Sequence, residues 1–403
     1  MKVLTAKSGI KVLFHQTSSK LVSCRYFIKC GAIDEHEKRE QGLCHALEHM
    51  LFAGTDVRDW EDIQLGFRRL GAYSNASTAL GFTEYEILVP AENFSGSFEI
   101  LADLLYNSTL HEDRWEQVEK GIIITEIQGV LDNPEFLAEA NTMSHMLGPS
   151  FHPVMGSILN IAKARVKDLT SFKDKYYASS NIFLSVAGGI KEKELLRIID
   201  KYDRLPSRRP LARKKRVYKS NLSSKVFKKE GLGQTIIHFI KPCRNSNTLS
   251  EKVNQSTALD MLNNHLMSEI REKRGLCYHI AVDVNTEIPQ KSFFVVSSYS
   301  ATKETAQEIV NQTQLALTRF LEDGVNQDNL LQAKMENYRN FLGLESNPPL
   351  ISDIMGESYV EGKGLVPFED YYKILNQISL NSVRKSIAGL VKGDYKVTIL
   401  EGD

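Results

Sequence analysis

The chain has 403 residues, which is too long for one ordinary hydrophobic core and predicts two domains of about 200 residues each. Its 50 basic and 50 acidic residues balance, which argues against nucleic acid or an acidic membrane as the main partner. The five cysteines form no C-x-x-C pair, the start lacks the apolar core of a signal peptide, and no run approaches the roughly 18 apolar residues of a membrane span. We therefore expect a cytoplasmic protein that does not enter the membrane.

Apolar periodicity predicts a mixture of strands and helices along residues 1–205. The expected strands are Val3–Ala6, Lys11–His15, Ser23–Lys29, Tyr73–Thr78, Thr83–Val89 and Ile182–Ala187. The expected helices are 41–55, Trp60–Leu70, Ala91–Asn107, Glu112–Leu131, Pro134–Met146, Val166–Tyr177 and Glu192–Tyr202. The segment 206–222 follows and is rich in Lys and Arg; it is either a nucleic-acid or targeting patch or a solvated linker. We favour the linker, because neither flank repeats the charge.

Residues 223–403 repeat the order of elements in the first part. The expected strands are Lys225–Lys229, Gln234–Ile240, Tyr278–Val284, Ser292–Ser298 and Lys396–Leu400, and the expected helices are Leu249–Arg274, Thr302–Glu322, Gln327–Leu344, Ser352–Tyr359, Phe368–Ile378 and Leu380–Leu390. The segments that begin at Leu169 and Leu380 also match, each leading through a helix to an apolar strand. The pattern predicts an α+β fold of two related domains, mostly antiparallel sheet packed with helices, that arose by duplication.

The segment 41–55 carries His45, Glu48 and His49 in the order H-x-x-E-H. Positions i, i+3 and i+4 share one face of an α-helix, so both imidazoles can reach the same metal ion. Catalytic zinc takes three protein ligands and a water, and a nearby carboxylate can accept a proton from that water. The motif by itself also fits a surface helix that happens to carry two histidines.

A third ligand has to come from another element packed against this helix. Glu126 is the candidate, and Glu119 lies seven residues before it, two turns along the same helical face. Two aligned carboxylates on an otherwise apolar helix are unusual if they face a dry core. The alternative is that both point to solvent, as most glutamates do.

The motif, with a glutamate 77 residues after His49, resembles the inverted zinc motif of the pitrilysin/insulinase-type metallopeptidases, the inverzincins. Four segments are similar to parts of that family. Segment 42–55 is similar to its zinc helix, and 71–76 to its substrate-binding edge strand. Segment 180–189 is similar to the closing strand of its first domain, and 271–278 to its Arg/Tyr motif. The resemblance covers essentially the whole chain. It implies a zinc-binding catalytic domain in residues 1–205 and a related domain without a zinc motif in residues 223–403.

The resemblance also implies a role for each matching residue. His45, His49 and Glu126 would bind one zinc ion per chain, Glu48 would be the general base, and Glu119 would support the metal face from behind the ligands. The edge strand with Asn75 and Ala76 would pair with an extended peptide. Phe52 would wall a specificity pocket, with ordinary packing as the alternative.

Arg271 and Tyr278 would hold a peptide carbonyl and stabilise its developing negative charge. The alternative is a cation at a helix end and a half-buried tyrosine. Full-length relatives carry four such domains that enclose a chamber, whereas this chain carries two. The resemblance therefore implies half of a clamshell chamber and a homodimer in which the zinc of one protomer faces Arg271 and Tyr278 of the other.

The leading hypothesis is a zinc endopeptidase that hydrolyses short, unfolded peptides inside a dimeric chamber. One alternative is a noncatalytic structural or assembly subunit of the same fold. Another is a maturation peptidase dedicated to one peptide precursor. The sequence assigns no cleavage preference, because no charged specificity pocket can be placed.

Overall fold

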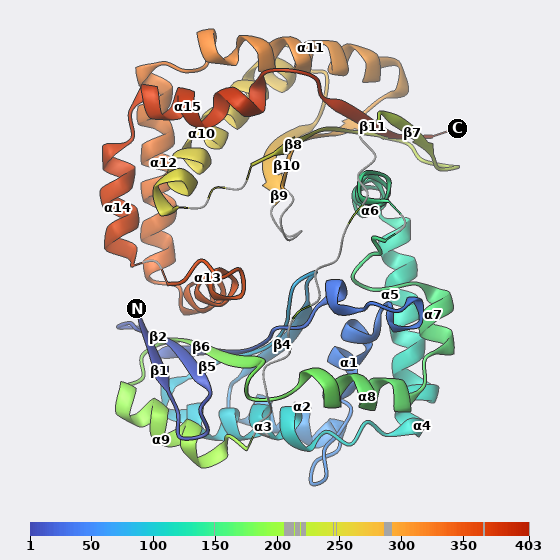
Figure 1. Cartoon of the computed structure of the whole chain (residues 1–403), viewed down its shortest axis with the longest axis vertical. Coiled ribbons are helices and arrows are strands. Elements are labelled where there is room, and N and C mark those ends of the chain that lie inside the picture. The colour runs from blue at the N-terminus through green and yellow to red at the C-terminus, as the bar shows by residue number, and fades with distance from the viewer. Residues whose placement is uncertain are drawn as a thin grey trace. The chain divides into compact units, whose positions relative to one another are not determined.

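The computed structural model describes residues 1–148, 150–204, 213, 218, 223–244, 246, 248–285, 292–365 and 367–402. These residues form two compact units, each with its own sheet (Figure 1). Each unit also has its own hydrophobic core. Each unit is an α+β arrangement in which helices pack on a mostly antiparallel sheet, and the predicted fold class is confirmed.

The first unit contains a six-stranded sheet in the order β1-β2-β6-β3-β5-β4, in which β4 is an edge strand. Its strands are β1 (Lys2–Thr5), β2 (Lys11–Gln16), β3 (Leu21–Ile28), β4 (Tyr73–Thr78), β5 (Thr83–Pro90) and β6 (Ile182–Gly188), and only β2 and β6 pair in parallel. Its helices and helical turns are η1 (Ala32–Asp34), η2 (Lys38–Glu40), α1 (Leu43–Leu51), α2 (Trp60–Arg69), η3 (Ala91–Asn93), α3 (Phe94–Asn107), α4 (Glu112–Arg114), η4 (Trp115–Glu119), most of α5 (Lys120–Asp132), α7 (Ile158–Lys163), α8 (Val166–Tyr176), α9 (Glu192–Tyr202) and α13 (Pro348–Val360).

The second unit contains a five-stranded sheet in the order β7-β11-β8-β10-β9. Its strands are β7 (Lys225–Lys228), β8 (Thr235–Cys243), β9 (His279–Asn285), β10 (Ser292–Ala301) and β11 (Lys396–Glu401), and only β7 and β11 pair in parallel. Its helices are α6 (Pro134–Leu147), α10 (Leu249–Leu266), the turn η5 (Met267–Glu272), α11 (Lys303–Asp323), most of α12 (Gln327–Glu345), α14 (Phe368–Gln377) and α15 (Leu380–Val391).

Each unit includes a helix from the other half of the sequence. The helix α13 packs on β2, β3 and β6 of the first sheet, and α6 packs on β8 and β11 of the second. On α13, the Ser352 hydroxyl is 2.7 Å from that of Ser23, and Gly356 lies so close to the Phe27 ring that no larger residue fits there. The units are therefore discontinuous, whereas we expected the continuous ranges 1–205 and 223–403. Of the expected linker 206–222, only Arg213 and Tyr218 are among the described residues.

Two of the predicted helices contain a π-helical turn. The turn η4 interrupts the helix expected over 112–131, and η5 ends the one expected over 249–274. In such a turn the backbone N–H bonds to the carbonyl five residues earlier, so residues i and i+5 stack on one another. The amides of Lys120 and Lys273 make these bonds, to the carbonyls of Trp115 and Ser268. Apolar periodicity gives no sign of either turn.

Candidate metal centre

The helix α1 is fixed at its N-terminus by a buried carboxylate. Glu35 accepts the backbone N–H groups of Gly42 and Cys44 at 2.8 and 2.7 Å, which satisfies donors that a helix start leaves free. Gly42 has φ 96°, and a Cβ there would lie 2.9 Å from the carbonyl oxygen of Met155, so the turn into the helix requires glycine. This start sets which residues of α1 face the core.

The predicted apolar back of α1 is confirmed. Leu43, Leu47, Met50 and Leu51 are buried in the first core. The opposite face carries His45, which is buried, together with Glu48 and His49, which are half-buried.

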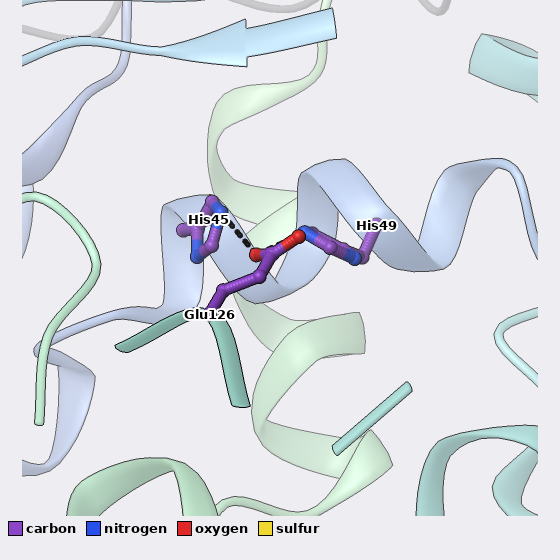
Figure 2. Close-up of side chains that lie close together, drawn as sticks. All are labelled: His45, His49 and Glu126. Atoms are coloured by element: carbon purple, nitrogen blue, oxygen red, sulfur yellow. Dashed lines mark ion pairs between the residues drawn. The ribbon is translucent and has the colours of Figure 1, made fainter. Parts of the chain in front are cut away.

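The three predicted ligands converge although Glu126 is distant in sequence. Figure 2 shows the Glu126 carboxylate between the imidazoles of His45 and His49. The Oε2 atom of Glu126 lies 3.6 Å from Nε2 of His45 and 3.2 Å from Nε2 of His49, and the three potential ligand atoms all lie within 4.8 Å of one another. Within the described part of the chain, this cluster has the composition of a metal site.

The donor set fits zinc. Two imidazoles and one carboxylate are a usual catalytic zinc set, with metal–ligand distances of about 2.0–2.2 Å. Ligands at that distance in tetrahedral geometry are separated by roughly 3.3 Å, close to both measured nitrogen–oxygen distances. The arrangement also leaves the Nδ1 atom of His45 buried without a hydrogen-bond partner.

Glu119 lies behind His49, as the resemblance implies. Its Oε2 atom is 3.5 Å from Nδ1 of His49, and its side chain is only 7% exposed. Arg114, which the sequence analysis did not single out, donates to the other carboxylate oxygen of Glu119 through Nε at 2.8 Å and Nη2 at 2.7 Å. Burial alone would raise the pKa of Glu119, but the hydrogen bonds from His49 and Arg114 lower it. Glu119 is therefore an ionised acceptor.

The two histidines differ in their affinity for protons. Burial, together with the neighbouring His49, lowers the pKa of His45 to about 4. Burial by itself would also lower the pKa of His49, but the hydrogen bond to Glu119 and the charge of Glu126 outweigh it and raise that pKa. His45 is thus neutral near pH 7, whereas His49 holds its proton more tightly than an isolated imidazole does.

Glu48 is tied to the edge strand of the sheet. The Thr78 hydroxyl, at the end of β4, donates to Oε2 of Glu48 at 2.5 Å. Burial raises the pKa of Glu48, while the Thr78 hydrogen bond and the charge of His49 oppose that shift. Sequence reasoning missed Thr78, because no local pattern links a threonine in a strand to a helix 30 residues earlier.

The residues expected to bind substrate have mixed surroundings. Asn75 is exposed on β4 and pairs with Glu86, while Ala76 is half-buried and pairs with Tyr85. Phe52 is partly buried, with its ring centre 6.1 Å from that of Tyr85, as ordinary packing would also give. β4 is an edge strand of the sheet, the position at which a further strand can pair.

Arg271 and Tyr278 lie together in the second unit. Arg271 is on the π-helical turn η5, and Tyr278 comes directly before β9. Gly275, with φ 61°, ends the helical segment between them. The Arg271 guanidinium lies 5.3 Å from the ring centre of Tyr278, which is 72% exposed rather than half-buried. The pair thus presents a cation and a phenol to solvent.

Two related units, one of which carries the inverted H-x-x-E-H motif with a converging glutamate, define a class of zinc peptidase fold. Residues 11–156 match the family described as insulinase (peptidase family M16), and residues 163–337 match its Peptidase M16 inactive domain. The chain belongs to the M16 peptidase family. The match of residues 163–337 to the inactive domain agrees with the absence of H-x-x-E-H from the second sequence half.

Known proteins extend this similarity over the chain. It is 26% identical over 388 residues to an uncharacterized zinc protease of Rickettsia felis, covering 94% of this chain and 92% of that protein. A stretch of 200 residues is 32% identical to the mitochondrial-processing peptidase subunit beta of Homo sapiens, covering 48% of this chain and 40% of that subunit. A protease from Helicobacter pylori shares the fold, with a TM-score of 0.87 over 99% of both chains at 19% identity. Among the described residues, no helix is both long and apolar enough to cross a membrane.

Proposed function

We propose that this protein is a zinc-dependent endopeptidase that hydrolyses short, unfolded peptides. The observation that carries the proposal is the convergence of His45, His49 and Glu126 beside Glu48. Bound zinc would supply an acidic water and a Lewis acid for the peptide carbonyl. Glu48 accepts the proton of the attacking water and returns it to the leaving amine.

The edge strand supports a role in holding the substrate. A peptide that pairs with the edge strand β4 is extended, and its backbone hydrogen bonds to the strand hold it alongside β4. Because Thr78 ends β4 and donates to Glu48, the strand that would bind the peptide also orients the base. We attribute the restriction to short, unfolded peptides to the dimeric chamber proposed below, which a folded domain could not enter.

We further propose that two copies of the chain complete each site. Arg271 and Tyr278 of one protomer bind and polarise the peptide carbonyl opposite the zinc of the other, within a dimeric chamber. The support is the exposed Arg271–Tyr278 pair in a chain that carries two units of the family fold.

The first experiment measures the zinc content and the cleavage of an internally quenched peptide by the wild-type protein. About one zinc per chain together with cleavage is expected. Without zinc, or without cleavage of a broad peptide library by the dimer, the noncatalytic subunit becomes the better account. Cleavage of a single precursor from a mixed library would instead identify a dedicated maturation peptidase.

Replacing Thr78 with valine is expected to lower kcat/KM by roughly 10–150-fold, because a hydrogen bond to a charged group contributes about 1.5–3 kcal/mol. The base must be ionised, so activity is lost as pH falls through the pKa of Glu48. The Thr78 bond lowers that pKa, so Thr78→Val should lose activity at a higher pH than the wild type does. The pH profile of kcat/KM tests this, with Ser77→Ala as control, since that hydroxyl donates to Glu84 instead. Identical acid limbs for Thr78→Val and the wild type would contradict it.

Zinc binding is expected to release a proton and to weaken as pH falls. The pKa of His49 is raised, so a larger fraction of the protein carries this proton than would at an ordinary histidine, and the proton has to leave before Nε2 can bind metal. Calorimetric titration in buffers of different ionisation enthalpy counts the released protons. The Glu119→Gln variant should release fewer at the same pH, because Glu119 is the strongest influence that raises this pKa. No proton release by the wild type across pH 6–8, a range set about the ordinary histidine value, would refute the assignment.

A further inference from the structure

Arg114 is connected to the metal centre through one residue, Glu119. Its Nε and Nη2 atoms both lie on one oxygen of Glu119, at 2.8 and 2.7 Å, and the other oxygen of Glu119 lies 3.5 Å from Nδ1 of His49. A continuous polar path thus runs from a guanidinium to a predicted metal ligand. Arg114 itself is 27% exposed at the side chain, so the path begins at the edge of solvent.

The π-helical turn η4 creates this contact. Arg114 and Glu119 are five residues apart, a spacing that places two side chains on different faces of a regular α-helix. The i to i+5 bonding of a π turn brings them together. In the second unit, Glu269 on η5 and Arg274, two residues after that turn ends, are also five residues apart, and Oε2 of Glu269 lies 2.9 Å from Nη1 of Arg274. π-helical turns are rare, and they occur frequently at functional sites.

The guanidinium of Arg114 also lies over an aromatic ring. Its central carbon lies 5.3 Å from the ring centre of Trp60, the first residue of α2. This contact and the two hydrogen bonds restrict Arg114 to one orientation. Glu119 cannot rotate without breaking the contacts with Arg114, so the oxygen that faces His49 is fixed as well.

We propose that Arg114 is a positioning residue for the metal centre. It fixes the Glu119 carboxylate so that the carboxylate holds the Nδ1–H of His49 and leaves Nε2 of His49 as the donor for the metal. Ligand imidazoles in metal sites depend on such a partner for their tautomer and ring orientation. The inference rests on the zinc binding of the proposed function. The competing account is an ion pair that only stabilises the fold.

The test compares Arg114→Met and Arg114→Lys with a matched control, Arg58→Met. Arg58 is also a partly exposed arginine, 24% at the side chain, and it pairs with two carboxylates, Asp103 and Glu99, that do not touch the metal ligands. The zinc dissociation constant, measured by competition with a chromogenic chelator, is expected to rise about 10–100-fold for Arg114→Met. Arg114→Lys keeps the positive charge but lacks the paired N–H donors of the guanidinium, so its zinc dissociation constant should lie between those of the wild type and Arg114→Met. Arg58→Met should stay within roughly twofold of the wild type.

A double variant separates positioning from mere stabilisation. If Arg114 acts through Glu119, then Arg114→Met should add almost nothing to the loss of zinc affinity already caused by Glu119→Gln. The ¹⁵N resonances of His49 in the zinc-loaded protein should show Nδ1–H in the wild type and a changed pattern in Arg114→Met, whatever the activity.

Two outcomes would overturn the inference. One is zinc affinity that is unchanged in both Arg114 variants while Glu119→Gln weakens it. The other is a loss of zinc affinity in Arg58→Met as large as that in Arg114→Met, since the loss would then follow from reduced stability alone. Arg114→Lys retains the charge and gives a result even if Arg114→Met fails to fold. If the wild type binds no zinc at all, the proposed function has failed rather than this inference.

Discussion

Replacing Glu48 with glutamine is expected to lower kcat/KM for peptide hydrolysis by about 10³-fold or more while one zinc per chain remains bound. The change keeps the size and the hydrogen-bonding capacity of the side chain but removes the group that accepts a proton. Glu48 is half-buried and is hydrogen-bonded by Thr78, so its amide replacement has the same space and the same neighbour. Zinc should stay, because His45, His49 and Glu126 are unaltered. Zinc content and cleavage of a quenched peptide, measured on the same preparation, check both parts.

The matched control is Glu116→Gln. Glu116 lies on the turn η4 near the site but pairs with Lys120 at the surface, so its neutralisation should leave hydrolysis unchanged. A Glu48→Gln variant that keeps more than about a tenth of the wild-type rate would remove Glu48 as the general base, since general bases contribute about 10²–10⁴-fold. A variant that loses zinc together with activity would show that Glu48 also acts on the metal.

Mixing two inactive variants is expected to restore activity. One variant carries Glu48→Gln, and the other carries Arg271→Ala together with Tyr278→Phe. If each site takes its zinc from one protomer and Arg271 and Tyr278 from the other, a mixed dimer has one intact site and one site with both defects. Random exchange of protomers then gives roughly a quarter of the wild-type rate, because half of the dimers are mixed and each has one working site.

Each variant alone provides the baseline for this experiment, and dimer exchange is followed with differently tagged protomers. Sites that are complete within one chain would give no recovery on mixing. Full activity from a monomer that keeps its zinc would exclude a site shared between protomers. So would full activity from a heterodimer whose only zinc-bearing protomer faces a partner that lacks both Arg271 and Tyr278.

Much of the local structure was predictable because it depends on local interactions. The alternation of apolar residues gave most strands and helices close to their observed bounds, and the spacing of His45, Glu48 and His49 gave one face of a helix. Departures occur where a cap or a proline sets the boundary. The helix α13 begins at Pro348, four residues before the expected Ser352, because the Asn347 side chain accepts the N–H of Leu350 and proline suits a first helical turn.

The predicted third ligand, Glu126, could not be assigned from the pattern of residues alone. The residues alone favoured a solvent-facing position for Glu126 and Glu119, and the resemblance to a peptidase family selected them as site residues. The structure brings Glu126 within 3.6 Å of His45 and within 3.2 Å of His49. The convergence depends on how α5 packs against α1, and no pattern within either helix specifies that packing.

The sequence by itself determined the face of α1 that carries the histidines, which follows from spacing within one segment, and the order of the elements, which follows from apolar periodicity along the chain. The class of protein followed from the resemblance of several segments to a peptidase family. Only the tertiary structure decided that α13 joins the first sheet and α6 the second, that Thr78 holds Glu48, and that Arg114 holds Glu119. The first two are contacts between segments far apart in sequence. The third needs a π-helical turn, whose five-residue pairing lies outside the 3.6-residue period from which helical faces are read.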